Sequence, residues 1–325
     1  MSHIAPEIIV ALQQLEGIGN KTIMNGIIGK LDPTESLYTL SDLQSFWTTL
    51  KGKKLETITS YDLRRAYDKA SRIIAESDKQ VIHLITYYDE VYPEILRSCV
   101  DESGKPDPPL VLYYRGDLHT LEKPGIAVIG TREPSPNGVR AGEYFASEFA
   151  KRGYNIVSGL AIGCDTSGHR GALNAGGSTT AFLANGLDWN SIYPKENLDL
   201  AKEIVEQGGL LLSEYPIGQN CGRYGLVARD RLQAGLSIAT VVIQTDIKGG
   251  TMHAVNATLA AHKPVFAVEY GANTPDATYP KTQGNKWLIK GNKAFPLRSK
   301  ELDQAIGIIE RRSINNNFPT SLFPD

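Results

Sequence analysis

Between residues 125 and 270 the sequence alternates short apolar runs with amphipathic stretches, and this alternation limits the fold more than any other feature. The apolar runs predict strands at Ile126–Ile129, Asn155–Val157, Thr179–Leu183, Leu210–Leu212, Ile238–Ile243 and Val265–Val268. The stretches between them predict helices at Gly138–Arg152, His169–Ala175, Asn197–Gln207, Leu226–Ala234 and Thr251–Ala261. Runs that are apolar throughout are typical of strands covered by helices on both faces. The pattern therefore predicts an α/β fold with a doubly wound, mostly parallel sheet.

Composition excludes several classes of protein. No apolar run reaches the roughly 18 residues of a membrane span, and Met1–Ile4 does not resemble the start of a signal peptide, so we expect a cytoplasmic protein with no membrane association. Three scattered cysteines argue against a disulfide framework or a zinc site, and we expect neither a metal nor a cofactor. The net charge of -2 means that nucleic-acid binding would require a local basic patch.

The first 79 residues have a helical pattern. Ile8, Leu12 and Leu15 recur at helical spacing before Gly17-Ile18-Gly19, and a second apolar periodicity follows. Helix, glycine turn and helix form the pattern of a helix-hairpin-helix, whose turn and second helix start can bind a DNA phosphate with help from Lys21. Two short helices need such a turn without DNA as well, so both interpretations stay open. Tyr61–Glu76 predicts a further helix.

Residues 80–123 look like a connecting segment, with turns around Tyr87–Pro93 and Asp107–Pro109 and a strand at Val111–Tyr114. Its tyrosines could stack on bases, but packing against the following domain is the favoured role.

The first two strand-end loops are candidate phosphate sites. Gly130-Thr131-Arg132 combines a close backbone approach with a guanidinium, and it lacks the G-x-G-x-x-G fingerprint of dinucleotide binding. The second loop begins at Ser158-Gly159 and continues to Arg170. Within it Asp165 and His169 are four residues apart, which permits an acid–base pair, but a capping role for the aspartate is favoured because no nucleophile accompanies them.

The third and fourth strand-end loops extend this pattern. Arg229 and Arg231 near a helix start could bind successive phosphates, with Asp230 offsetting part of their field, or could be solvated surface residues. Lys248, Gly249, Gly250 and Thr251 form a candidate anion nest without Walker A spacing, which argues against nucleoside triphosphate hydrolysis. We expect no catalytic residues.

Several ordered motifs then identify a resemblance to the DNA-processing protein A family (DprA, also called Smf). The matching stretches are Tyr87–Pro93, Pro108–Asp117 (PPLVLYYRGD), Val128–Arg132 (VIGTR), Ser158–Leu173 (SGLAIGCDTSGHRGAL), Gly186–Asn197, Gly209–Pro216 (GLLLSEYP), Arg229–Ser237 (RDRLQAGLS) and Gly284–Ile289. The resemblance implies a helical, SAM-like domain over residues 1–79 and an extended Rossmann-like domain over residues 80–310. Residues 311–325 look like a disordered tail, with no winged-helix domain.

The resemblance also implies a function. Members of the family bind single-stranded DNA without catalysis, usually as homodimers, and deliver it to the RecA recombinase in recombination and natural transformation. Their G-S/T-R loop and R-N-R helix start hold the DNA backbone, which transfers to Gly130, Thr131, Arg132, Arg229 and Arg231; Ser158, Gly159, Arg170 and Lys248–Thr251 complete the expected site.

This sequence departs from the family pattern at the site itself. Asp230 replaces an asparagine, Ala228 replaces a common basic residue, and Met252-His253 replaces an aliphatic residue and a threonine. An alternative interpretation therefore stays open: the cleft binds a nucleotide-derived signal, as Rossmann-like sensors do, or belongs to a nucleotide-processing protein, with phage defence as one such role.

Overall fold

The computed structural model describes residues 3–315, and the chain divides into two compact units. One unit comprises Met1–Tyr92 and Pro109–Tyr113, and the other comprises Pro93–Pro108 and Tyr114–Asp325, as far as these ranges are described. The expected domain boundary near residue 79 coincides with the end of a long helix, whereas the division by contacts falls at Tyr92. No helix in the described part of the chain is both long and apolar enough to cross a bilayer.

The first unit is mainly helical. It contains α1 (Pro6–Gln13), α2 (Leu40–Trp47), α3 (Ser60–Lys79) and the strand β1 (His83–Thr86). After α1 and the turn at Gly17, whose φ of 69° suits glycine, a π-helical segment covers Thr22–Ile27 and a 3-10 turn covers Ile28–Lys30. Thr39 and Thr59 each form a capping box, with Asp42 and Asp62 respectively, which fixes where α2 and α3 begin.

The second unit is built on a parallel sheet. Its strands are β3 (Gly125–Ile129), β4 (Asn155–Ser158), β5 (Thr179–Leu183), β6 (Leu210–Ser213), β7 (Ser237–Val242), β8 (Val265–Val268) and β9 (Phe295–Leu297). They are hydrogen-bonded in the order β6-β5-β4-β3-β7-β8-β9, and each of these pairings is parallel. The remaining strand, β2 (Val111–Gly116), spans the boundary between the units.

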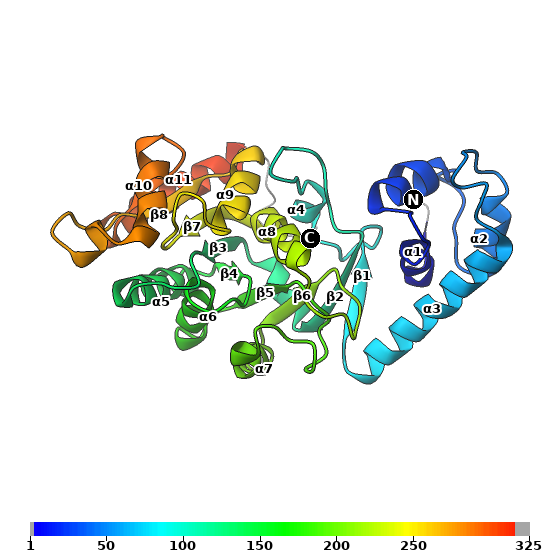
Figure 1. Ribbon diagram of the computed structural model, residues 1–325, viewed down its shortest axis with the longest axis horizontal. Coiled ribbons are helices and arrows are strands. Elements are labelled where there is room, and N and C mark those ends of the chain that lie inside the picture. The colour runs from blue at the N-terminus through cyan, green and yellow to red at the C-terminus, as the bar shows by residue number, and fades with distance from the viewer. Residues whose placement is uncertain (1–2, 316–325) are drawn as a thin grey trace. The chain divides into compact units, whose positions relative to one another are not determined.

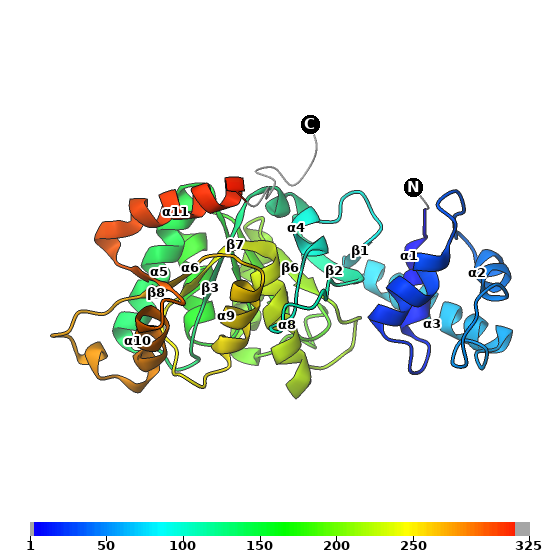
Figure 2. The ribbon, with the colours of Figure 1, turned by 90° about the horizontal axis from the view of Figure 1, so that it is seen from above.

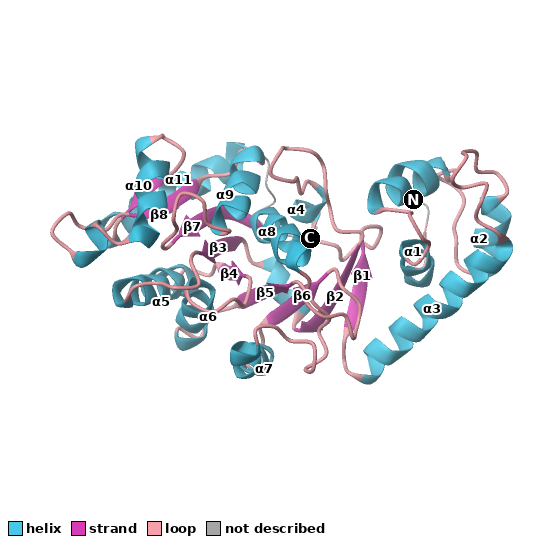
Figure 3. Cartoon of the chain, viewed as in Figure 1, coloured by secondary structure: helices cyan, strands magenta, loops and turns pink. Residues whose placement is uncertain are grey.

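Helices cover both faces of this parallel sheet (Figures 1 and 3). On one face lie α5 (Pro136–Lys151), α6 (Cys164–Asn174) and α7 (Leu198–Glu206), and on the other lie α8 (Arg223–Leu236), α9 (Thr251–Ala260) and α10 (Gln283–Lys290). The unit also contains α4 (Glu94–Arg97) and α11 (Leu302–Asn315). Figure 2 shows α8 and α9 side by side. The double cover explains why every residue of the strands from β3 to β8 is buried.

The strand order reverses between β3 and β7. From β3 the chain proceeds through β4, β5 and β6 in one direction, then returns to place β7 on the opposite side of β3, with Ile129 level with Val242. At such a switch point the two following loops leave the sheet on opposite faces and open a crevice between them. The packed floor beneath it comprises Ala127, Ile129, Val242, Ala254, Val255, Val265, Ala267, Leu288 and Ala294.

The predicted fold class is confirmed, and each of the six strands predicted between residues 125 and 270 lies within one residue of an observed strand. β1, β9, α4, α10 and α11 were not predicted from the sequence, and the helix predicted from His169 begins five residues earlier in the structure, at Cys164. The structure places residues 311–315 in α11, and the rest of the predicted tail lies outside the described residues.

Candidate nucleic-acid interface

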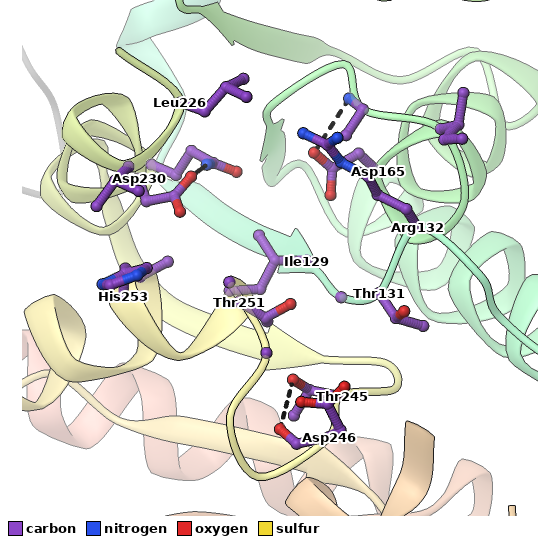
Figure 4. Close-up of a pocket in the computed structure, with 18 of the residues that line it drawn as sticks. Ile129, Thr131, Arg132, Asp165, Leu226, Asp230, Thr245, Asp246, Thr251 and His253 are labelled. Atoms are coloured by element: carbon purple, nitrogen blue, oxygen red, sulfur yellow. Dashed lines mark hydrogen bonds between the residues drawn. The ribbon is translucent and has the colours of Figure 1, made fainter. Parts of the chain in front are cut away.

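A cleft of about 620 Å³ opens at the switch point between β3 and β7 (Figure 4). Its lining comes from the loop after β3, the loop after β4 with the start of α6, one face of α8, the loop after β7 with the first turn of α9, and Lys281. In Figure 4 Asp230 and His253 lie on one side of the cleft, and Thr131 and Arg132 lie on the other. Every lining residue belongs to the second unit, so the cleft is contained within one body of the protein.

The loop after β3 holds Arg132 at the mouth of the cleft. The amide of Thr131 donates to the carbonyl of Gln244 at 2.7 Å, and the Thr131 carbonyl accepts from the amide of Cys164 at 3.1 Å. A Cβ on Gly130 would lie 2.5 Å from the Sγ of Cys164, so this close passage requires glycine. Arg132 itself is exposed and forms no ion pair within residues 3–315, which leaves its guanidinium available to an anion.

The start of α9 supplies a second group of donors. Gly249, Gly250 and Thr251 line the cleft, and α9 begins at Thr251. The amides of Gly250 and Thr251 make no hydrogen bond to the described part of the chain, as is usual for the first turn of a helix. Free amides and the positive end of the helix dipole favour an anion at this position. This turn faces the Arg132 loop across the cleft (Figure 4).

Arg229 extends from α8 over the end of β4. Its Nε lies 3.4 Å from the Oδ1 of Asp230, and its Nη1 lies 3.7 Å from the Oδ2 of Asp165. Both nitrogens are buried and neither makes a hydrogen bond in the described structure. A Cβ on Gly159 would lie 1.1 Å from Nη1, so the guanidinium occupies the space that glycine leaves at the strand end. Arg229 therefore lies close to two carboxylates, but its Nε and Nη1 do not form hydrogen bonds with them.

The two acid–base candidates of α6 have separate partners. The Oδ2 of Asp165 accepts hydrogen bonds from the amides of Gly159 and Ala161, at 3.1 and 3.2 Å. His169 is fully buried and its Nδ1 contacts the Oγ1 of Thr179 at 2.7 Å. Burial lowers the pKa of His169 to about 3, so the ring is neutral at physiological pH. Asp165 thus holds the loop between β4 and α6 and does not pair with His169; it does not cap α6, whose N-cap is Gly163 and has no side-chain capping bond.

Asp230 faces the cleft from α8. Its Oδ1 accepts from the Nε2 of Gln233 at 2.9 Å, and burial raises the pKa of its carboxyl to about 6 against the opposing field of Arg229. Across the lining, three fixed cations face four carboxylates, namely Arg132, Arg229 and Lys281 against Glu133, Asp165, Asp230 and Asp246. Lys281 is itself paired with Asp246 at 3.1 Å. The cleft is therefore polar and nearly balanced in charge rather than strongly basic.

Of the predicted phosphate-binding residues, the structure brings seven together in the cleft and places five outside its lining. The seven are Gly130, Thr131, Arg132, Arg229, Gly249, Gly250 and Thr251, and the five are Ser158, Gly159, Arg170, Arg231 and Lys248. Gly159 lies directly behind Arg229 and Ser158 is fully buried, where its hydroxyl donates to the carbonyl of Val128. Arg170 is paired with Glu203, and the amide of Lys248 donates to Asp246.

Arg231 has a structural environment quite different from that of Arg229. Its Nη1 and Nη2 donate to the two carboxylate oxygens of Glu214 at 2.8 and 2.9 Å, and its Nε lies 2.5 Å from the Oδ2 of Asp107. The residue is only 8% exposed. Arg231 therefore joins α8 to the loop after β6 and to the segment before β2, and it does not face the cleft.

Two features of the cleft were not predicted from the sequence, namely its apolar lining and its third cation. Ile162, Leu226 and Val227 line the cleft, and Ile162 and Val227 stay about two-fifths exposed. Part of the α8 lining follows from helical spacing. Leu226, Arg229 and Gln233 are three and four residues apart, so they lie on one face of a helix. Lys281 lies in a loop far along the chain, and no local pattern in the sequence predicts that it reaches the cleft.

Comparisons with known proteins agree with this architecture. The family model described as DNA recombination-mediator protein A matches residues 83–306. DNA processing protein DprA of Bacillus subtilis (strain 168) is 32% identical over 267 residues, which are 82% of this chain and 84% of that protein. Protein Smf of Escherichia coli (strain K12) is 35% identical over 220 residues, or 68% of this chain. The chain spans 55% of that relative and 57% of Protein Smf of Synechocystis sp..

Two solved structures resemble the chain at the level of the fold. The structure of DNA processing protein A from Streptococcus pneumoniae aligns with a TM-score of 0.73 at 25% identity and covers 93% of this chain and 98% of that one. The structure of DNA processing protein A from Helicobacter pylori, described for its single-stranded DNA binding mode, aligns with a TM-score of 0.58 at 29% identity and covers 71% of this chain and 96% of that one. From the family match, the shared length and the common fold, we conclude that this chain belongs to the DNA recombination-mediator protein A family.

Proposed function

We propose that the chain binds single-stranded DNA in the cleft between β3 and β7. One observation carries this proposal: the unpaired guanidinium of Arg132 and the free amides of Gly250 and Thr251 line the same cleft, together with exposed apolar side chains. A phosphate would lie between these donors, and the base would pack against Ile162 and Val227. Backbone charge and apolar contact without base-edge readout suit a sequence-tolerant single-strand binder. The Helicobacter pylori relative, described as a single-stranded DNA binder, supports the assignment.

We further propose that the bound strand is protected and delivered to a RecA-type recombinase, during recombination or natural transformation, by a homodimer. Family membership supports this role. The expected result is that substoichiometric protein relieves the inhibition of RecA filament assembly by single-strand-binding protein in a strand-exchange assay. Unchanged kinetics at every protein concentration would contradict the recombinase role while leaving DNA binding intact.

Arg132→Glu tests the binding site directly. Fluorescence anisotropy with a labelled oligothymidine at low salt should show at least a tenfold loss of affinity, because the variant replaces an unpaired cation with an anion. Arg311→Glu is the matched control, since Arg311 is exposed on α11 and does not line the cleft. Its affinity should stay within about twofold of wild type, which is the scatter expected of a distant surface charge. Arg231 is unsuitable for this test because its loss would break a buried ion pair.

The nucleotide-sensor alternative predicts a different outcome. If the cleft takes a mononucleotide-derived signal, thermal shifts should appear with mononucleotides or cyclic nucleotides and not with oligothymidine. Equal affinities of Arg132→Glu and wild type for the oligonucleotide would overturn the proposed DNA site.

A further inference from the structure

Arg229 is the unusual cation of the cleft, because it is deeply buried yet lacks hydrogen bonds at two of its nitrogens. Its side chain is 6% exposed, and its Nε and Nη1 have no hydrogen-bond partner within residues 3–315. Two carboxylates lie close enough to neutralise it but too far away, or too poorly aligned, to bond those nitrogens. Buried donors in native structures are almost always satisfied, so a guanidinium left in this state at a cleft indicates a missing acceptor.

The two neighbouring carboxylates are not equivalent. Asp165 accepts two backbone amides and is part of the structure of its loop. Among the described residues, Asp230 accepts a hydrogen bond only from the side-chain amide of Gln233, and it lines the cleft from one helical face. Asp230 is thus the partner of Arg229 that a ligand can displace or discharge.

The charged groups around Asp230 come from every element that packs against it. Arg229 lies beside it on α8, Asp165 lies on α6, His253 lies on α9, and Arg132 lies in the loop after β3. The Nδ1 of His253 lies 3.0 Å from the Oε2 of Glu102, so the histidine has an acidic partner of its own. Burial raises the pKa of Asp230 to about 6, so its carboxyl can change charge close to neutral pH.

We propose that Asp230 competes with the phosphate of the ligand for Arg229, and that protonation of Asp230 releases the arginine to the ligand, so that binding takes up one proton. This inference rests on the proposed binding of DNA in the cleft. Asp230 is a specificity-determining residue in this scheme, because its charged form opposes a polyanion and its neutral form admits one. The neutral carboxyl can also donate a hydrogen bond to a phosphate oxygen, which the carboxylate cannot.

The pH range of the effect follows from the site. Burial holds the pKa of Asp230 at about 6, so the carboxyl is mostly ionised above neutral pH in the free protein. A phosphate beside it disfavours the carboxylate and raises that pKa further in the complex. Proton uptake on binding then makes the affinity rise as the pH falls from 8 towards 6, with a limit of about tenfold per pH unit for one proton.

The test measures affinity against pH for wild type and variants. The probe is an oligothymidine without terminal phosphates, because its phosphodiesters do not titrate between pH 5.5 and 8. For wild type we expect the dissociation constant to fall by about threefold to tenfold per pH unit below pH 8. Asp230→Asn should bind more tightly than wild type at pH 8 and lose most of this slope. Asp199→Asn, a matched control on the exposed face of α7, should keep both the wild-type affinity and the wild-type slope.

His253→Gln removes the imidazole that lies near Asp230, and it should keep the slope whatever its effect on affinity. Calorimetry of wild type in two buffers of different ionisation enthalpy gives the number of protons taken up directly, without relying on a variant. Uptake of close to one proton at pH 7 supports the proposal.

Three outcomes are distinguishable. No binding of wild type at any pH overturns the proposed function and the inference with it. Binding with a flat pH profile and no proton uptake overturns the inference alone, as does a slope that persists in Asp230→Asn. Loss of the slope in His253→Gln instead would assign the proton to the histidine and exclude Asp230.

Discussion

Arg229, Asp230 and Arg231 are consecutive residues with three different environments. Each residue of a helix is turned by about 100° from the previous one, so positions i and i+2 point almost in opposite directions. Arg229 therefore lies over Gly159, Asp230 faces the cleft, and Arg231 points away to Glu214 and Asp107. A pair of arginines at this spacing cannot bind successive phosphates in one cleft.

Asp230 should also reduce the stability of the fold at neutral pH. Its folded pKa of about 6 lies above the unfolded value of 3.8, so the native state binds the proton more tightly. The contribution of this group to stability is fully present below pH 3.8 and is lost as the pH rises through 6. Asp230→Asn should therefore raise the free energy of unfolding at pH 8 by about 1–3 kcal/mol, and by about half as much at pH 5. Urea denaturation at the two pH values checks this. An equal effect at both would contradict it.

At the scale of elements, α8 couples the cleft to the rest of the unit. One face carries Leu226, Arg229 and Gln233 towards the cleft, and the opposite side carries the Arg231–Glu214 pair. The side chain of Lys263, buried before β8, donates to the carbonyls of Ala234 and Gly235 at the end of the helix. Contacts that do not touch the ligand thus hold the helix that presents Arg229 and Asp230.

Arg231→Leu should destabilise the protein rather than weaken the site. Removing one partner of a buried ion pair leaves Glu214 uncompensated, which typically costs about 3–5 kcal/mol. The double variant Arg231→Leu with Glu214→Leu should recover part of that loss, since neither charge then remains buried and unpaired. Denaturation measures the stability, and anisotropy below the unfolding transition should give an affinity within about twofold of wild type. A large loss of affinity in a folded variant would return Arg231 to the binding site.

The elements that were predicted well from the sequence are those with a clear pattern of apolar residues. The strands from β3 to β8 are apolar runs bounded by turn residues, and the six predictions among them needed no tertiary information. By contrast, β9 has only three residues, and the first turn of α6 contains Cys164 and Asp165, whose helical state depends on the bonds that Asp165 makes to Gly159 and Ala161. The predicted residues that reached the cleft are glycines, a threonine and arginines close to strand ends. Those that did not are held by partners from distant segments, such as Glu203 for Arg170.

At the scale of the whole molecule, the chain and the proposed binding cleft both have a nearly balanced charge. A chain with a formal charge of -2 and a nearly balanced cleft cannot rely on a long electrostatic track. The fold creates the cleft without a strong positive charge, because the switch point between β3 and β7 brings five segments of the chain to one crevice.

The salt dependence of binding should therefore be shallow. Arg132, the α9 amides and two nitrogens of Arg229 are the cleft donors that the described structure leaves without a hydrogen bond, and Arg229 is balanced by nearby carboxylates, so we expect one or two phosphates to be bound. For single strands the slope of log K against log salt is about -0.7 per neutralised phosphate, so we expect a value between about -0.7 and -1.4. Anisotropy titrations over a range of potassium chloride concentrations give this slope. A value steeper than about -3 would indicate a basic track beyond the cleft, because it would require four or more phosphates.

Gly159 has a consequence for how such a protein can change over evolutionary time. The space that its missing side chain leaves is filled by Arg229, from a helix seventy positions later in the chain. Even a single methyl group at residue 159 would overlap the guanidinium, so the two positions are not free to vary independently. In descendants of this chain a larger residue at 159 requires the guanidinium of Arg229 to move out of this space or the arginine to be replaced.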